Sequence, residues 1–349
     1  MSYEYERVAA PRSGLRLHLN ENTAGCSPRV LEALKTMTRE DAAFYPDYTD
    51  AIDACAVWLG VGHDRVLLTN GLDEGILAAS VAAMRGTDGG QPYEAVVVVP
   101  AFDMYAACVD AAGGRVIEVP LAPDFSFDPE AVTVAVTPRT RLVFLTNPNN
   151  PTGQGIRRDA ILAIARHAAH ATVFLDEAYA DFAGDTLIGD SALDRFPNII
   201  VGRTFAKAWG LAGLRIGALI GSAETMAPLR RVVPPYSLNA YAARALPAAL
   251  ADRGYYDWYL EQVRTSKGLL YEALQRLSIP FWNSSGNFVL ARFGVDAPRV
   301  MAGVAARQVF LRDRSRDPGC EGCVRIGAGV VAHTEACIAA IKEVLCGAP

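Results

Sequence analysis

The run "AVVVVP", residues 95–100, decides the fold class of this chain. Its four consecutive valines show no alternation between apolar and polar positions, so the strand that they predict is covered on both faces. Such strands are typical of a mostly parallel sheet between two layers of helices. The amphipathic stretch "DMYAACVDAA" (103–112) follows, and a strand followed by a helix indicates an α/β fold.

The same alternation extends on both sides of this run. Upstream, the predicted strand "RVLLTN" (65–70) leads into the helical stretch "DEGILAASVAAM" (73–84). Downstream, further strands are predicted in "RVIEVP", "RLVFLTN", "TVFLDEAY", "NIIVGRT" and "LRIGALIG". In sheets of this kind, ligands bind beyond the carboxyl ends of the strands. We therefore expect the residues at these ends to carry the chemistry.

The pattern changes from about Leu246. One long helical stretch covers residues 255–277, and the short strands "GNFVLARF", "VFLRDR" and "CVRIGAG" and a closing helix from His333 follow it. This order predicts a smaller α/β domain around an antiparallel sheet. We expect an N-terminal arm and part of the small domain in residues 1–40, the large domain in 41–245 and the small domain in 246–349.

Composition excludes several classes of protein. The chain has 349 residues, 51% of them hydrophobic and 20% charged, which is ordinary for a globular enzyme. A net charge of −5 provides no basic surface for nucleic acid or anionic lipid. The first residues are polar and acidic, unlike a signal peptide, and no run of 18 apolar residues occurs. We expect a soluble, cytoplasmic protein that binds neither nucleic acid nor membrane.

Seven cysteines are scattered along the chain, and an odd number without an export signal favours free thiols. Cys320 and Cys323 form one C-x-x-C pair. A zinc site would need two more ligands, and neither a second pair nor two suitably spaced histidines follow. We expect no metal, and a loop with incidental thiols.

Four functional groups follow predicted strands. Asn150 lies in the turn "LTNPNNPTG", Asp176 and Tyr179 lie in "VFLDEAYADF", and Lys207 follows "IIVGRT". They bring an amide, a carboxylate, a phenol and an amine to one crevice. A buried carboxylate is costly unless it meets a cation or a protonated ring nitrogen. Taken by itself, Lys207 could equally be a half-buried lysine whose amine extends to water, and the segment around Asn150 could be a simple turn.

Anion-binding features complete this set. In "TNGLDEGI" (69–76), Gly71 permits close approach, and the free N–H groups of Leu72 and Asp73 begin a helix. Asp73 is equally explained as a partner of the helix dipole. Arg215 adds a guanidinium suited to phosphate and Thr204 a hydroxyl. Pyridoxal 5′-phosphate has the phosphate, the ring nitrogen and the amine-reactive aldehyde that this set requires.

The sequence resembles fold-type I pyridoxal-phosphate-dependent aminotransferases, and within them the histidinol-phosphate aminotransferase family. The resemblance runs nearly end to end and rests on eight motifs in the family's order and approximate spacing. They are "LNEN" (19–22), "YPD" (45–47), "GLDE" (71–74), "NPNNPTG" (147–153), "DEAY" (176–179), "KAWGLAGLRIG" (207–217), "GNFVL" (286–290) and "VRIGAG" (324–329).

The resemblance implies a role for each matching residue around the cofactor. Lys207 would form the Schiff base and then move the proton at the substrate's α-carbon. Asp176 would keep the pyridine nitrogen protonated, Asn150 and Tyr179 would bind the ring's 3-oxygen, and Phe102 would stack on the ring. The cofactor's phosphate would be held by Leu72, Asp73, Thr204 and Arg215.

The resemblance also implies substrate contacts and a homodimer used in amino-acid biosynthesis. Tyr45 would reach the phosphate in the neighbouring subunit, so that the two subunits share their active sites. Arg325 would bind a substrate carboxylate, and Asn22 would contact substrate. Arg312 is either a further anion contact or a solvated loop charge, since Arg314 and Arg316 lie beside it.

Two departures from the family's pattern bear on substrate and cofactor. Thr23 and Ala24 stand where the family has proline and tyrosine, and that tyrosine is a contact of the substrate's phosphate. Ala206 stands where the family has serine, which removes a hydroxyl from the cofactor's phosphate cup. The expected reaction passes an amino group from a donor such as L-glutamate to a keto or aldehyde acceptor. The alternatives are a decarboxylase of the threonine-phosphate decarboxylase type and a non-catalytic, aminotransferase-like sensor.

Overall fold

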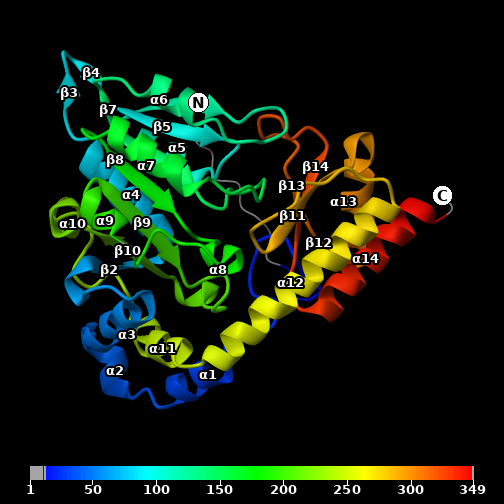
Figure 1. Ribbon diagram of the computed structural model, residues 1–349. Helices are drawn as coiled ribbons and strands as arrows, with labels where there is room; N and C mark the ends of the chain where they lie inside the picture. The colour runs from blue at the N-terminus through cyan, green and yellow to red at the C-terminus, as the bar shows by residue number, and fades with distance from the viewer. Residues whose placement is uncertain (1–10, 12, 190, 348–349) are drawn as a thin grey trace.

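The computed structural model describes residues 11, 13–189 and 191–347. Its central feature is a seven-stranded sheet between layers of helices (Figure 1). β10 runs antiparallel to both of its neighbours, and the other neighbouring strands pair in parallel, so the mostly parallel sheet is confirmed. The spatial order is β2 (Val66–Asn70), β10 (Ile216–Gly221), β9 (Ile199–Thr204), β8 (Thr172–Asp176), β7 (Thr140–Thr146), β5 (Glu94–Val99) and β6 (Arg115–Pro120).

Side chains of these strands alternate between two cores, one on each face of the sheet. In β7, Val143 and Leu145 enter one core, whereas Leu142 and Phe144 enter the other. Burial on both faces explains why the strand sequences are apolar without interruption. The first core is covered by α1 (Pro28–Lys35), α3 (Thr49–Leu59), α6 (Pro129–Ala135), α7 (Arg158–His167), α9 (Ala192–Arg195) and α11 (Ala240–Leu250), and the second by α4 (Gly71–Ala83), α5 (Met104–Ala111) and α10 (Ala223–Arg230).

A smaller three-stranded sheet, antiparallel throughout, forms beside the first. Its order is β11 (Phe288–Arg292), β14 (Cys323–Gly327) and β13 (Arg312–Asp313). It shares a separate core with α12 (Arg253–Arg276), α13 (Ala297–Ala306) and α14 (Val331–Cys346). The remaining strands and α-helices are β1 (Leu15–Arg16), which pairs with β12 (Val309–Phe310), the hairpin β3 (Thr87–Asp88) and β4 (Gln91–Pro92), and the short helices α2 (Arg39–Ala43) and α8 (Ala180–Ala183).

The division into domains stays a prediction. The boundary predicted between residues 245 and 246 falls inside α11, which packs in a core of the seven-stranded sheet. We propose to place it between α11 and α12. Within the described ranges, no helix is both long and apolar enough to cross a membrane.

The direction of the strands sets the position of the candidate site. The carboxyl ends of β2, β5, β7, β8 and β9 lie at one edge of the sheet, and antiparallel β10 begins at that edge. The segments that follow these strands therefore converge, together with Arg215, which directly precedes β10. This edge is where a doubly wound sheet binds its ligand.

Candidate active site

A cavity of about 170 Å³ opens where the strand ends converge. Asp176 is the last residue of β8 and Thr204 the last of β9, and Lys207 follows three residues later. Most of the residues predicted from the sequence line this one cavity: Leu72, Asp73, Phe102, Asn150, Asp176, Tyr179, Thr204, Lys207 and Arg215.

The start of α4 and Arg215 form one end of the cavity. The Arg215 carbonyl accepts the Gly71 N–H at 2.9 Å, and Arg215 Nη2 donates to Asp73 Oδ2 at 2.7 Å. Gly71 has a φ of +75°, and a Cβ there would lie 2.5 Å from Arg215 Nη2. A Cβ on Gly217 would lie 2.6 Å from the Leu72 nitrogen. The two glycines thus let a guanidinium and a helix N-terminus meet, an arrangement suited to a phosphate.

Asp176 is the buried carboxylate of the site. Tyr105 donates to Asp176 Oδ2 at 2.6 Å, and the Ala178 N–H donates to Oδ1 at 2.8 Å. Burial raises the pKa of Asp176 to about 6, against the lowering effect of these two hydrogen bonds. None of the ion pairs among the described residues includes Asp176. The site thus holds a carboxylate that a protonated ring nitrogen would neutralise.

Tyr105 and Thr146 are site residues that the sequence reasoning missed. The Tyr105 hydroxyl lies 2.9 Å from Thr146 Oγ1, and both residues line the cavity. A signal for Tyr105 was present, because it lies in the first turn of the helix that begins next to Phe102, and the two rings meet edge to face with centroids 5.9 Å apart.

The amine of Lys207 lies inside the cavity. Its Nζ donates to the Leu19 carbonyl at 3.0 Å and lies 5.9 Å from the centroid of the Tyr179 ring. The Tyr179 hydroxyl in turn accepts a hydrogen bond from Asn20 Nδ2 at 3.0 Å. Asn20 was missed, although it belongs to the same "LNEN" motif as the predicted contact Asn22.

Arg325 lies behind Asn150, on the small sheet. Its Nη1 donates to Asn150 Oδ1, and its Nη2 donates to the His18 carbonyl at 2.7 Å. Burial lowers the pKa of the guanidinium to about 10, still well above neutrality. Its buried Nε has no hydrogen-bond partner among the described atoms. Arg325 thus carries a buried positive charge with one donor that lacks a partner among the described atoms.

Besides Gly71 and Arg325, which contact residues of the lining, three predicted residues do not line this cavity. Asn22 donates to the Ala208 carbonyl and accepts the Ala24 N–H, and it lines a second cavity of about 710 Å³ together with Thr23 and Ala24. Arg312 lies on β13, opposite Arg325 in the sheet register. Tyr45 is 78% exposed and stacks on Tyr236, with ring centroids 4.2 Å apart.

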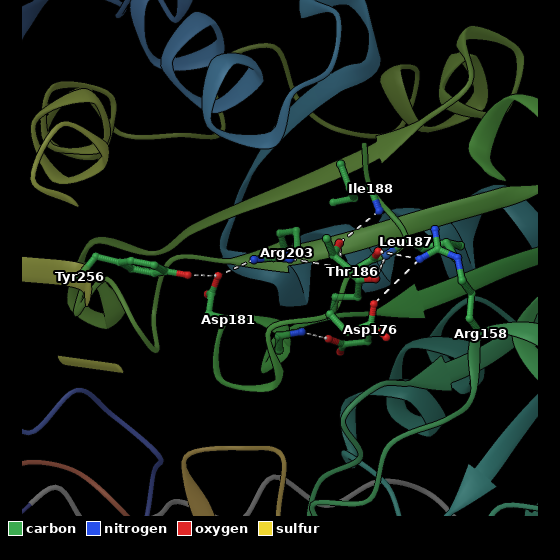
Figure 2. Close-up of polar contacts among 11 residues, drawn as sticks. Arg158, Asp176, Asp181, Thr186, Leu187, Ile188, Arg203 and Tyr256 are labelled. Carbon is green, nitrogen blue, oxygen red and sulfur yellow. Dashed lines mark hydrogen bonds and ion pairs between the residues drawn. The ribbon is translucent and has the colours of Figure 1, made fainter. Parts of the chain in front are cut away.

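A buried ion cluster adjoins the site and was not predicted. Arg203 Nη1 donates to Glu177 Oε2 at 3.2 Å, and its Nη2 donates to Asp181 Oδ1 at 2.5 Å (Figure 2). Glu177 also accepts the Leu187 N–H at 2.7 Å and the Thr186 hydroxyl. The carboxylate next to Asp176 therefore finds its cation inside the protein, whereas Asp176 does not.

These residues fit pyridoxal 5′-phosphate on the geometry of the cavity. The start of α4 and Arg215 supply N–H donors and a positive charge for a phosphate, and Asp176 supplies a carboxylate for a cationic ring nitrogen. Phe102 lines the cavity with an aromatic face suited to a flat ring, and Lys207 supplies the amine.

Comparison with known proteins gives one family. The sequence pattern of "Aminotransferase class I and II" matches residues 12–341. Histidinol-phosphate aminotransferase 2 of Ralstonia nicotianae is 35% identical over 95% of this chain and 88% of its own length. The corresponding enzyme of Cytophaga hutchinsonii is 32% identical over 94% of this chain and 91% of its own length.

A solved structure agrees with these relatives. Histidinol-phosphate aminotransferase from Sinorhizobium meliloti, in complex with pyridoxal-5′-phosphate, superposes with a TM-score of 0.84 and 28% identity, over 95% of this chain and 90% of that one. Aspartate aminotransferase from Thermus thermophilus, at 24% identity and a TM-score of 0.77, shares the fold. The chain belongs to the class I and II aminotransferase family.

Proposed function

We propose that this chain is an aminotransferase, as the names of its relatives state of them, and that it moves the amino group of a donor such as L-glutamate to a keto or aldehyde acceptor. Its cofactor is pyridoxal 5′-phosphate. The observation that carries the proposal is the single cavity that joins the amine of Lys207, the carboxylate of Asp176 and the anion-binding start of α4. The decarboxylase and the sensor are not favoured, because the matching family and the relatives named above are aminotransferases.

Each residue at the cofactor has a proposed task. When bound, pyridoxal phosphate supplies an aldehyde for the lysine and a ring that withdraws electrons from the substrate's α-carbon. Asp176 holds the proton on the ring nitrogen, which sustains that withdrawal. Tyr179 accepts from Asn20, so its own hydroxyl proton is free to bind the ring's 3-oxygen. Asn150 Oδ1 accepts from Arg325, which leaves the amide NH₂ as the second donor to that oxygen.

Lys207 carries the proton transfer in this proposal. Its Nζ would accept the proton from the substrate's α-carbon as the general base and would later release it as the general acid. The Leu19 carbonyl accepts one N–H of the amine at 3.0 Å, which fixes the direction of Nζ. The chain between Leu19 and Asn22 thus positions both the amine, through its carbonyl, and Tyr179, through Asn20.

We expect the Arg325→Lys variant to raise the KM for L-glutamate by about 10- to 100-fold, the range for losing a hydrogen bond to a charged group. The guanidinium is buried and has a free Nε, so it offers a carboxylate a second, parallel donor that lysine lacks. Steady-state kinetics measure the effect, and exposed Arg316→Lys serves as the control. An unchanged KM in Arg325→Lys contradicts the assignment.

The acceptor is the least constrained part of the proposal. Ala24 and Thr23 line the 710 Å³ cavity, which meets the first cavity at Ala206. Small side chains at 24 and 206 leave this side of Lys207 open. The test is the reverse reaction, in which purified protein and 2-oxoglutarate are mixed with histidinol phosphate or with an unphosphorylated amino acid. Formation of glutamate identifies the partner that the open side accepts.

We propose a homodimer with shared active sites. Phe44, Tyr45, Tyr236 and Tyr241 are exposed aromatic residues around α2 and the start of α11. Large exposed aromatic side chains are costly in water and are enriched at protein interfaces. A cytoplasmic location stays a prediction.

We expect mixed dimers to recover activity if sites are shared. Tyr45→Ala weakens cofactor binding, because the neighbouring phosphate loses a hydroxyl donor, whereas Lys207→Ala is inactive. A dimer formed from one subunit of each variant contains one site with both native residues. Refolding the two variants together and measuring activity checks this, and a mixture no more active than its parts contradicts shared sites.

A further inference from the structure

The buried ion cluster next to the site consists of Glu177, Asp181 and Arg203. It contains two carboxylates and one guanidinium, more charged groups than are needed to neutralise one buried carboxylate. Arg203 is 4% exposed and binds both acids, each through a different nitrogen. A buried ion cluster seldom stabilises a fold more than apolar residues of the same volume would. What the planar guanidinium does provide is fixed geometry between the groups that it binds. In sequence, Glu177 follows Asp176 and Arg203 precedes Thr204. The contacts of Arg203 therefore also fix the positions of the strand ends at Asp176 and Thr204.

Together with three aromatic residues, the cluster forms a closed ring of contacts. These residues are Tyr256, Trp209 and Trp58. The Tyr256 hydroxyl donates to Asp181 Oδ1 at 3.0 Å, as Figure 2 shows, and its ring stacks on Trp209 with centroids 4.3 Å apart. Trp209 packs edge-on against Trp58, at 5.5 Å. The Arg203 guanidinium lies over the Trp58 ring, 5.0 Å from its centroid, which closes the ring of contacts.

Lys207 lies between two aromatic residues that contact Trp58 of this ring of contacts. Phe205 and Trp209, the residues two positions before and after it, both pack on Trp58. The side chains of Phe205 and Trp209 are therefore both fixed by buried contacts. A shift of Tyr256 against Trp209 would reach the lysine through two residues of backbone.

Tyr256 also stands at the junction of the two cores. It belongs to a core of the seven-stranded sheet, whereas Val263, Leu270 and Leu274, further along the same helix, belong to the core of the small sheet. In Figure 1, α12 (yellow) runs from beside α11 to α14. The small sheet carries Arg325. One helix thus links the arginine of the small sheet to the lysine segment of the large one.

We propose that Tyr256 and Arg203 are positioning residues for Lys207, and that Tyr256 links the placement of the small sheet to the lysine through Asp181 and Trp209. The proposal rests on the proposed role of Lys207 in amino transfer. Neither residue lines the cavity, so both act through the segment that carries the amine.

The test compares Tyr256→Phe with Tyr271→Phe. Both tyrosines lie on α12 and both hydroxyls are hydrogen bonded, but that of Tyr271 bonds to Ser284, away from the ring of contacts. Tyr256→Phe keeps the aromatic face and removes only the bond to Asp181. We expect its kcat with L-glutamate to fall about tenfold, within the range for a small misplacement of a reacting group, with the KM unchanged. Tyr271→Phe keeps the wild-type kcat.

A second readout does not depend on turnover. Pyridoxal phosphate is added to cofactor-free protein, and the rate at which the visible absorption band of the lysine-bound cofactor develops is measured. We expect this rate to fall severalfold in Tyr256→Phe and to stay at the wild-type value in Tyr271→Phe. Thermal unfolding of the cofactor-free proteins separates this effect from a general loss of stability, because the two variants should melt close together.

Asp181→Asn completes a double-mutant cycle. If Tyr256 acts through Asp181, adding Tyr256→Phe to Asp181→Asn lowers kcat less than it does in the wild type. The proposal is overturned if Tyr256→Phe keeps both the wild-type kcat and the wild-type rate of band formation, or if the two changes are additive. Wild-type protein that transfers no amino group from glutamate would instead refute the proposed function, and the band-formation rates would still decide the positioning role.

Discussion

The Lys207→Ala variant is expected to lose amino transfer by at least about 10⁴-fold, the upper end for removal of a general acid–base group. Lys207 provides the only side-chain amine among the described residues that line the cavity. Without it, neither attachment of the cofactor nor movement of the α-proton has a basic nitrogen within reach. The visible absorption band of lysine-bound pyridoxal phosphate should also be absent. Activity with L-glutamate and the spectrum of the purified variant measure the two effects.

Lys267 provides the matched control. It is the other half-buried lysine with a defined partner, since its Nζ donates to the Ser284 carbonyl at 2.6 Å. Burial lowers the pKa of its amine to about 8, so on chemical reactivity alone it competes with Lys207 as a nucleophile. Lys267→Ala should keep both activity and the absorption band. If Lys267→Ala loses the band and Lys207→Ala retains it, the assignment of the lysine is wrong.

Asp176→Asn is expected to lower kcat by about 10²- to 10³-fold, the effect of removing one preorganised electrostatic group. Asparagine keeps the shape, and its one oxygen can accept the Ala178 N–H while its NH₂ faces the Tyr105 hydroxyl, but it carries no charge to hold a proton on the ring nitrogen. Pre-steady-state rates with L-glutamate measure the loss. Glu177→Gln is no substitute control, since Glu177 is paired to Arg203, so exposed Asp185→Asn is used.

The raised pKa of Asp176 gives this variant a second signature. The carboxyl becomes protonated as the pH falls through about 6, and a neutral acid no longer pairs with a cationic ring nitrogen. Cofactor binding by the wild type should therefore weaken below pH 6, and that of Asp176→Asn should lack this step.

The same raised pKa means that the ionised carboxylate of Asp176 destabilises the cofactor-free fold at neutral pH, although it favours cofactor binding. A carboxyl whose folded pKa lies above its unfolded value of 3.8 contributes stability that is fully present below pH 3.8 and is lost as the pH rises through 6. At neutral pH, cofactor-free Asp176→Asn should therefore be more resistant to urea than the wild type. Lower resistance would show that the carboxylate has a cationic partner in the folded protein.

The sequence predicts the fold and the strand-end residues because both depend on local patterns. An apolar run such as residues 96–99 marks a strand buried on both faces, and the residue that follows such a strand lies at the sheet's edge whatever the remaining topology. Asp176 and Thr204 were found in this way. Their roles stay predictions, to be decided by the variants above.

Contacts between distant segments were not predictable in the same way. Arg203 is the one charged residue of β9, and only the fold shows that Glu177 and Asp181 meet it. In "LNEN", the choice between Asn20 and Asn22 depends on the left-handed backbone at Asn20, where φ is +54°. Arg314, one of two charges that suggested a solvated loop around Arg312, is buried against Asp317 and the Ala101 carbonyl.

The most direct test of the central claim is the visible spectrum of purified protein with added pyridoxal phosphate, recorded before and after mixing with L-glutamate. We predict an absorption band from the lysine-bound cofactor that disappears on mixing, with one 2-oxoglutarate formed for each site. Failure of any band to form would contradict the cofactor assignment. A band that persists in the presence of L-glutamate would contradict the proposed donor and the transfer reaction built on it.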